Sequence, residues 1–195
     1  MKKIIGVDID GVITDETHSN KNVWHNALCE FLGYKIKRIK ESYYFDEAYG
    51  LSNEVVSTFL SENHVKIYGQ VKISEGAKDT LNYLYTSGFK IHLITAREAV
   101  YRQLTADWLK KHGIKYSSLT HEANKSPLAV EKGIELFIED NANNSLELSR
   151  KNIIVLLMNK YHNQNFKVNT NIIRVNNWSD IREEISNFYS LSTTG

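Results

Sequence analysis

The chain has 195 residues, with 24 Lys and Arg against 23 Asp and Glu, and its formal net charge is +1. A chain of this length can bury a sizeable core without disulfides, and it corresponds to one domain or to one domain with an insertion. The near-neutral charge argues against a general nucleic-acid binder, and the lone Cys29 excludes a disulfide framework and a cysteine-based zinc site. Because no apolar run is long enough for a membrane span or a signal peptide, we expect a cytoplasmic protein.

Short apolar runs recur along the chain and predict buried strands. They are Lys3–Val7, Phe89–Thr95, Ile134–Ile138 and Ile153–Met158, and a shorter strand is expected at Asn171–Val175. Each run is too short for an independent helix, and most are rich in β-branched residues.

Amphipathic stretches between these runs predict helices. Glu75–Ser87 and Glu98–His112 carry apolar residues at helical spacing, and a glycine that can form a left-handed C-cap follows each of them. Further helices are expected to start at Pro127 and to cover Asn141–Arg150 and Ser179–Tyr189. Strands that alternate with helices of this length indicate βαβ units, and therefore an α/β fold with a Rossmann-like parallel sheet in three layers.

The segment from residue 15 to residue 74 interrupts this alternation. It contains two helix-like stretches, Asn20–Leu32 and Ser52–Asn63, separated by an aromatic and polar stretch without a buried-strand run. We expect residues 15–74 to form a small helical cap inserted after the first strand. The α/β core would then consist of residues 1–14 and 75–195.

Polar side chains stand at the carboxyl ends of the expected strands, where open parallel sheets bind ligands. Asp8 and Asp10 follow the first strand and leave it on the same face, and Asp140 follows the third strand. Carboxylates that converge in this way repel one another unless a cation lies between them or one of them is protonated, and Mg²⁺ prefers such oxygen ligands. The Thr95 hydroxyl and the Lys125 ammonium are the groups that a phosphoryl group would need across from such a metal.

Four motifs in this order resemble those of the haloacid dehalogenase superfamily of phosphotransferases. They are DIDGVIT at Asp8–Thr14, LITAR at Leu93–Arg97, Lys125, and FIEDN at Phe137–Asn141. The short chain and the cap after the first motif are similar to the 5′(3′)-deoxyribonucleotidase-like branch of the superfamily. The resemblance implies a core of the haloacid dehalogenase type with Mg²⁺ as its cofactor.

Two positions depart from the pattern of this branch. Glu139 stands where the branch often has an aspartate, so it would either shift the metal or hold the metal ligands in place without binding the metal. Asn141 would have the second of these roles. Arg97 stands where the better-known relatives carry a smaller residue.

The resemblance also implies a mechanism. Asp8 would attack phosphorus and form an aspartyl-phosphate, and Asp10 would protonate the leaving alkoxide and then activate water. The implied metal ligands are Asp8, Asp10 through its backbone carbonyl, and Asp140, and the implied phosphate-binding residues are Gly11, Thr95, Ala96, Arg97 and Lys125.

The cap is expected to select the substrate. Tyr43, Tyr44 and Tyr49 are candidates for stacking on a base, although aromatic residues at these positions also suit a cap core. The expected substrate is a small phosphomonoester, foremost a (deoxy)nucleoside monophosphate, with sugar phosphates or other small phosphorylated metabolites as an alternative. A non-hydrolytic phospho-accepting or binding module is a further alternative. The order of the motifs disfavours a phospho-accepting receiver domain, and the chemically competent residues at all motif positions disfavour a binding module. No nucleic-acid polymer or membrane is expected as a partner, and the oligomeric state, a homodimer included, stays open.

Overall fold

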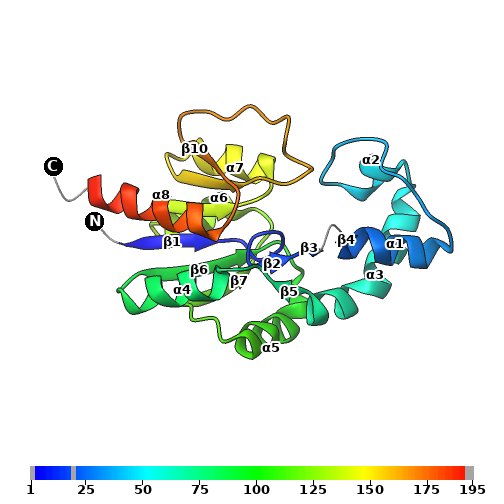
Figure 1. Ribbon diagram of the computed structural model, residues 1–195, viewed down its shortest axis with the longest axis horizontal. Helices are drawn as coiled ribbons and strands as arrows, with labels where there is room; N and C mark the ends of the chain where they lie inside the picture. Colours follow the sequence, from blue (N-terminus) through cyan, green and yellow to red (C-terminus); the bar gives the residue numbers. More distant parts are fainter. Residues whose placement is uncertain (1–2, 19–20, 192–195) are drawn as a thin grey trace.

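A parallel six-stranded sheet forms the centre of the protein, whose computed structural model describes residues 3–18 and 21–191 (Figure 1). The strand order is β10-β9-β8-β1-β6-β7, and every neighbouring pair is parallel. The strands are β1 (Ile4–Val7), β6 (Lys90–Thr95), β7 (Ser118–His121), β8 (Leu136–Glu139), β9 (Ile154–Met158) and β10 (Ile172–Val175). The predicted parallel sheet is confirmed, and β7 is the strand of this sheet that the apolar runs did not indicate. It lies at the edge of the sheet and all of its residues are half-buried, so it needs no continuous apolar run.

Helices cover both faces of the sheet and complete the predicted three layers (Figure 1). They are α4 (Ala77–Thr86), α5 (Arg102–His112), α6 (Lys125–Glu131), α7 (Ala142–Ser149) and α8 (Trp178–Leu191). On one face, α4, α5 and α8 contribute Leu81, Trp108 and Ile185 to a core shared with the strands. On the other face, α6 and α7 contribute Ala129 and Leu148 to a second core. The short 3₁₀ turn η1 (Ala99–Tyr101) precedes α5, so this α-helix begins later than Glu98.

Between β1 and α4 the chain leaves the sheet and forms a helical cap beyond the carboxyl ends of the strands (Figure 1). Its helices are α1 (Val23–Leu32), α2 (Phe45–Tyr49) and α3 (Asn53–Gln70). Leu28, Tyr49 and Phe59 lie in a hydrophobic core of the cap's own. Two short antiparallel strand pairs lie at the entry and exit of the cap: β2 (Thr14–Asp15) with β5 (Lys72–Ile73), and β3 (Thr17–His18) with β4 (Lys21–Asn22). Two-residue strands leave no hydrophobic run that a sequence could display.

Two predicted helix starts are corrected by the structure. The helix α6 begins at Lys125 and not at Pro127, which lies inside the first turn, where the missing N–H costs no helical hydrogen bond. The helix α1 begins at Val23, because the side chain of Asn22 accepts the backbone N–H of His25 at 2.9 Å and caps it. The predicted start at residue 20 lies outside the described residues.

The helix α3 is longer than predicted, because it continues to Gln70 instead of ending at Asn63. Its second half carries Ile67 and Tyr68, which are both buried. This extension lets α3 pack against α5 of the core. None of the helices in residues 3–18 and 21–191 combines the length and apolarity that crossing a membrane requires.

Candidate functional site

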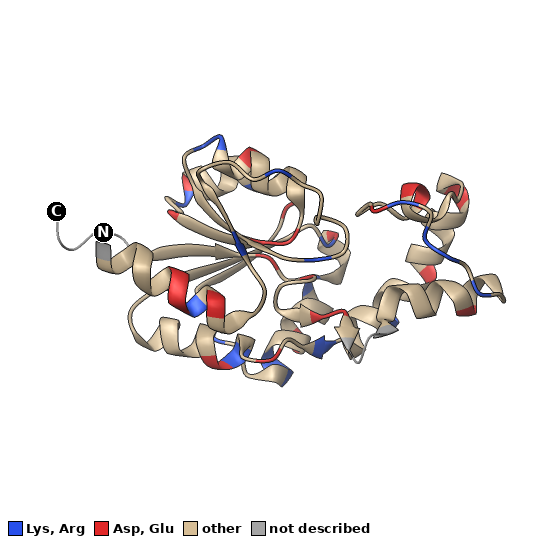
Figure 2. Cartoon of the chain, turned by 45° about the horizontal axis from the view of Figure 1, so that its top comes forward, with Lys and Arg blue, Asp and Glu red and all other residues tan. Residues whose placement is uncertain are grey.

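The ends of three neighbouring strands bring the predicted residues together. Asp8 follows β1, Thr95 ends β6, Glu139 ends β8 and is followed by Asp140, and Lys125 begins α6. All five side chains are buried. Figure 2 shows acidic and basic segments close together around these strand ends, on the side that faces the cap helices.

Lys125 holds the centre of a buried charge cluster. Its Nζ lies 2.7 Å from Asp8 Oδ1 and 2.7 Å from Glu139 Oε2. Burial works against the charge on Lys125, but the carboxylates of Asp8 and Glu139 outweigh it and raise the pKa of the ammonium group. Burial, followed by the charge of Glu139, raises the pKa of Asp8 in spite of Lys125. The cluster is therefore short of positive charge.

The acids of this cluster can hold a metal ion. Asp8, Glu139 and Asp140 each offer an oxygen within 4.8 Å of the others. Asp140 Oδ1 is buried and has no hydrogen-bond partner among the described residues, which is unfavourable for a carboxylate oxygen unless a cation reaches it. A hard, all-oxygen set of this kind suits Mg²⁺ or a similar divalent ion. Both oxygens of Glu139 are already engaged, one by Lys125 and one by the backbone N–H of Asn141, so Glu139 is better placed to hold Lys125 than to bind the metal.

Gly11 brings the backbone close to the Asp140 carboxylate. Its φ angle is +72°, and a Cβ at this position would collide with the Asp140 side chain. The N–H of Gly11 donates to Thr14 Oγ1 at 3.0 Å, which fixes the turn after β1. The close approach and the left-handed backbone both require glycine.

Asp10 is held by Arg97. The guanidinium donates from Nη2 to Asp10 Oδ1 at 2.6 Å and from Nε to Asp10 Oδ2 at 2.8 Å. Arg97 is 3 % exposed, and the Asp10 charge raises its pKa although burial opposes this. The guanidinium of Arg97, a predicted phosphate ligand, thus binds the catalytic candidate Asp10. The side chain of Asp10 does not belong to the acid cluster around Lys125.

Three more of the predicted residues have clear positions. The buried Oγ1 of Thr95 accepts the backbone N–H of Arg97 at 3.2 Å, which leaves its hydroxyl proton for another acceptor. Ala96, between these two residues, is exposed. Asn141 caps α7 by accepting two N–H groups of the first turn, so this helix has no need of Asp140 as its cap.

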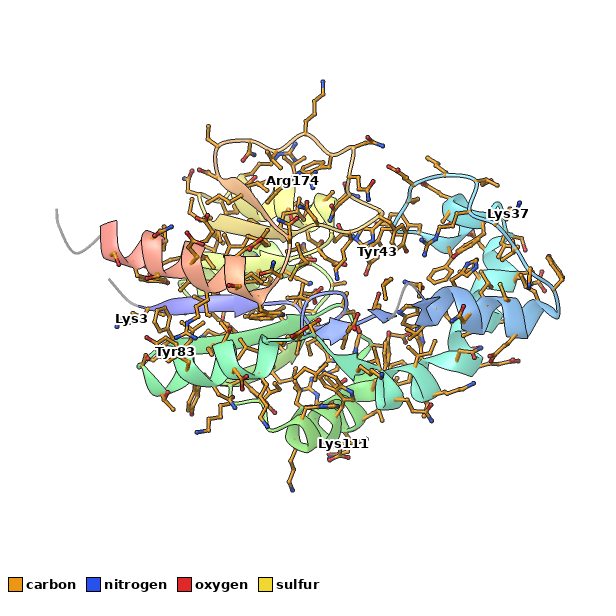
Figure 3. The ribbon with its side chains drawn as sticks, viewed as in Figure 1. Lys3, Lys37, Tyr43, Tyr83, Lys111 and Arg174 are labelled. Carbon is orange, nitrogen blue, oxygen red and sulfur yellow. The ribbon has the colours of Figure 1, made fainter. Side chains whose placement is uncertain are left out.

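A cavity of about 240 Å³ lies between the strand ends and the cap, and Asp10 is part of its wall. Much of the wall is aromatic, with Trp24, Phe45 and Tyr68 among the lining residues. Figure 3 shows Tyr43 where the cap faces the core, at the end of the sheet opposite to Tyr83.

The three predicted cap tyrosines do not share one place. Tyr43 and Tyr44 line the cavity. Tyr49 lies in the core of the cap instead, where its hydroxyl is 2.8 Å from His25 Nδ1 and accepts Arg38 Nε at 3.0 Å. The position of Tyr49 therefore corresponds to the alternative reading of these aromatic residues as cap core.

Two residues at the site were not indicated by any motif. Glu16 lines the cavity and accepts Trp24 Nε1 at 2.9 Å, and burial together with the charges of Asp10 and Asp140 raises its pKa to about 7. His162 Nε2 lies 3.2 Å from Asp140 Oδ2, and this contact raises the pKa of His162 although burial opposes it. Only the proximity of Glu16 to the first motif could have drawn attention to it.

Known proteins share the sequence pattern of this chain over nearly all of its length. A family model described as "5′ nucleotidase, deoxy (Pyrimidine), cytosolic type C protein" matches residues 2–189. A nucleotidase from Clostridium acetobutylicum is 32% identical over 182 residues, which cover 91% of this chain and 90% of that protein.

Solved structures share the fold at much lower identity. A crystal structure described as a predicted phosphatase from Clostridium acetobutylicum has a TM-score of 0.68 at 14% identity and covers 94% of this chain and 98% of that one. A haloacid dehalogenase-superfamily hydrolase from Geobacter sulfurreducens has a TM-score of 0.61 at 16% identity, with coverages of 94% and 100%. At such identities the likeness shows the fold alone. The family match over residues 2–189 and the nucleotidase at 32% identity, by contrast, show that the chain belongs to the 5′ nucleotidase, deoxy (Pyrimidine), cytosolic type C family and is a phosphomonoester hydrolase, and its fold is the one found in haloacid dehalogenase-superfamily hydrolases.

Proposed function

We propose that the protein hydrolyses nucleoside and deoxynucleoside 5′-monophosphates through a phosphorylated Asp8, with Mg²⁺ as its metal. The observation that carries the proposal is the position of Asp8: its carboxylate is buried against Lys125, beside Asp140, on the turn that leads to the aromatic cavity at Asp10. A nucleophile, a phosphate-binding cation and a space for a flat leaving group thus meet at one point.

The reaction would run in two steps on this chain's own residues. A carboxylate oxygen of Asp8 attacks phosphorus, the ester P–O bond breaks, and the leaving oxygen takes a proton from Asp10. Asp10 then takes a proton from the water that attacks the phosphoryl group, and the bond between phosphorus and Asp8 breaks. Lys125 and the Thr95 hydroxyl bind phosphoryl oxygens throughout.

Asp8, Asp140 and the backbone at Asp10 would hold the metal. Bound Mg²⁺ supplies positive charge that neutralises the phosphoryl oxygens. The support for this assignment is the shortage of positive charge in the acid cluster and the unpartnered Oδ1 of Asp140.

Residues 15–74 act as the cap in this proposal and hold the leaving group. Aromatic side chains such as Trp24 and Tyr43 offer faces for a base, and stacking contributes about 1–3 kcal/mol per base. A sugar phosphate has no flat ring system and would gain little from such a wall.

A panel of phosphomonoesters tests the substrate. We expect kcat/KM for the best deoxynucleoside monophosphate to exceed that for hexose and pentose phosphates by about 10-fold or more, as one stacked base provides. Sugar phosphates that turn over faster than every nucleotide would contradict the nucleotide assignment and leave the phosphatase assignment standing.

A location in the cytoplasm is also part of this proposal, which leaves the oligomeric state, a homodimer included, open. Light scattering on the purified protein measures the oligomeric state, and a fluorescent fusion reports the location.

A further inference from the structure

Arg97 fixes the orientation of the Asp10 carboxyl. The two bonds between them form a parallel fork, in which each carboxylate oxygen accepts one N–H of the guanidinium. A bidentate pair of this kind holds the carboxyl plane as well as its position, which a single hydrogen bond or a lysine cannot do. Asp10 therefore cannot rotate about its side-chain bonds without breaking both contacts.

Arg97 is itself held from three sides. Its backbone N–H donates to Thr95 Oγ1, and its Nη1 donates to Thr105 Oγ1 on α5 at 3.3 Å. On a further side the ring of Tyr68 lies against the guanidinium, with 3.9 Å between Cζ and the ring centroid. Such a stack stabilises a buried guanidinium and restricts its plane.

Tyr68 connects this arrangement to the cap. It belongs to α3 and is buried, and it also lines the cavity next to Asp10. The Tyr68 ring is held in turn by two other rings. The His64 ring stacks on it with 4.9 Å between ring centroids, and the Tyr101 ring contacts it edge-on with 5.4 Å between centroids. A displacement of α3 would thus reach Asp10 through Tyr68 and Arg97.

We propose that Arg97 and Tyr68 are positioning residues: together they aim the Asp10 carboxyl at the leaving oxygen, and Tyr68 makes that aim depend on the placement of the cap. The inference rests on the proposed role of Asp10 in proton transfer. It differs from a role of Arg97 in phosphate binding, because a phosphate ligand would serve every substrate equally.

Two substrates that differ in one methylene separate these roles. 4-Nitrophenyl phosphate releases a phenolate that is stable without a proton, whereas 4-nitrobenzyl phosphate releases an alkoxide that needs one, as a nucleoside does. The parameter kcat/KM covers the steps up to the phosphorylation of Asp8, so it reports proton donation to the leaving oxygen. Their nearly equal size makes contacts with the cavity wall similar for both.

The variant Arg97→Lys keeps the charge and loses the fork. We expect kcat/KM for 4-nitrobenzyl phosphate and for a deoxynucleoside monophosphate to fall about 10- to 100-fold, a large part of what a general acid contributes. For 4-nitrophenyl phosphate we expect a loss of about 3-fold or less. In the variant Tyr68→Leu we expect kcat/KM for 4-nitrobenzyl phosphate to fall about 5-fold with little loss for 4-nitrophenyl phosphate. The variant Tyr68→Phe, which keeps the ring, should behave like the wild type.

A matched control lies on the far side of the core. Arg182 stacks over Tyr83 with 4.2 Å between Cζ and the ring centroid, and Figure 3 shows Tyr83 at the end of the molecule away from the cap. The variant Arg182→Lys should leave kcat/KM for both substrates unchanged.

An equal loss on both nitro substrates in Arg97→Lys, or no loss on either, would overturn the inference. If Arg97→Lys does not fold, as thermal melting would show, the comparison of Tyr68→Leu with Tyr68→Phe decides in the same way. A wild-type protein that hydrolyses neither nitro substrate nor any nucleotide would instead refute the proposed function, so the two failures are distinguishable.

Discussion

Whether a side chain at the site is ionised depends on the groups nearest to it. Lys125 is buried as an ammonium because Asp8 and Glu139 surround its Nζ. The carboxyl of Glu16 accepts the Trp24 indole N–H, and burial together with the charges of Asp10 and Asp140 outweighs the charge of Lys160 and raises its pKa to about 7. Any group whose pKa differs between the folded protein and the unfolded chain makes folding depend on pH.

This dependence gives a stability prediction for Glu16. Its folded-state pKa is raised from 4.5 to about 7, so the folded protein binds more protons than the unfolded chain between these values and loses stability as pH rises. In Glu16→Gln the amide oxygen can still accept Trp24 Nε1 but carries no charge. In metal-free buffer we expect the free energy of unfolding of the variant, relative to the wild type, to rise by about 1–3 kcal/mol as the pH goes from 5 to 8. Urea unfolding would measure this.

A surface acid provides the control for that experiment. Glu147 on α7 is exposed, so Glu147→Gln should leave the difference from the wild type constant with pH. A constant difference in Glu16→Gln as well would show that Glu16 is ionised in the folded protein over this range.

At the scale of elements, the loop between β9 and β10 completes the site. It carries Tyr161 and His162 to the cavity, and the Arg38 guanidinium of the cap segment lies 3.4 Å from the Tyr161 ring centroid. Arg174 on β10 holds this loop from the core side (Figure 3), with bonds of 2.6 Å to Asn159 Oδ1 and 2.7 Å to the Phe166 carbonyl.

Removal of this contact should loosen the loop. In Arg174→Met several hydrogen bonds to a charged donor are lost, so we expect the free energy of local opening to fall by about 2 kcal/mol. Hydrogen exchange by mass spectrometry should show faster exchange in residues 159–171, and KM for a nucleotide should rise more than kcat falls. The variant Arg150→Met, at an exposed position after α7, should leave the exchange of this loop unchanged. Unaltered exchange in Arg174→Met would contradict the role of Arg174.

The sequence predicted those parts of the site that follow from chain order alone. Asp8, Thr95 and Asp140 follow or end buried parallel strands, and such strand ends meet at one edge of a sheet whatever the side-chain packing. The fork between Arg97 and Asp10 could not be predicted in this way, because it depends on side-chain rotamers and on the contact of α3 with α5. For the same reason the sequence did not separate Tyr43 and Tyr44, which line the cavity, from Tyr49, which lies in the cap core.

At the scale of the whole molecule, a formal net charge of +1 conceals a site that is rich in acids. Asp8, Glu139 and Asp140 are buried together, and Lys125 is the cation paired with two of them. A divalent cation can bind this acid cluster in the folded protein but not in the unfolded chain, so metal binding should stabilise the folded state.

Thermal unfolding with and without Mg²⁺ measures this link. At a Mg²⁺ concentration about 100-fold above its dissociation constant, we expect about 2.7 kcal/mol of added stability over the protein in EDTA. The variant Asp140→Asn should lose most of that gain, whereas Asp107→Asn, outside the site on α5, should retain it. An equal gain in both variants would contradict the assignment of Asp140 as a metal ligand.

The proposed mechanism depends most on Asp8 as the nucleophile, and the turnover of a deoxynucleoside monophosphate by Asp8→Asn tests it most directly. The substitution keeps the shape of the side chain and removes its nucleophilic oxygen, so we predict a fall in kcat of roughly 1,000-fold or more with a cooperative melting transition retained. Turnover within about 10-fold of the wild type by the folded variant would contradict the role of Asp8 as the nucleophile.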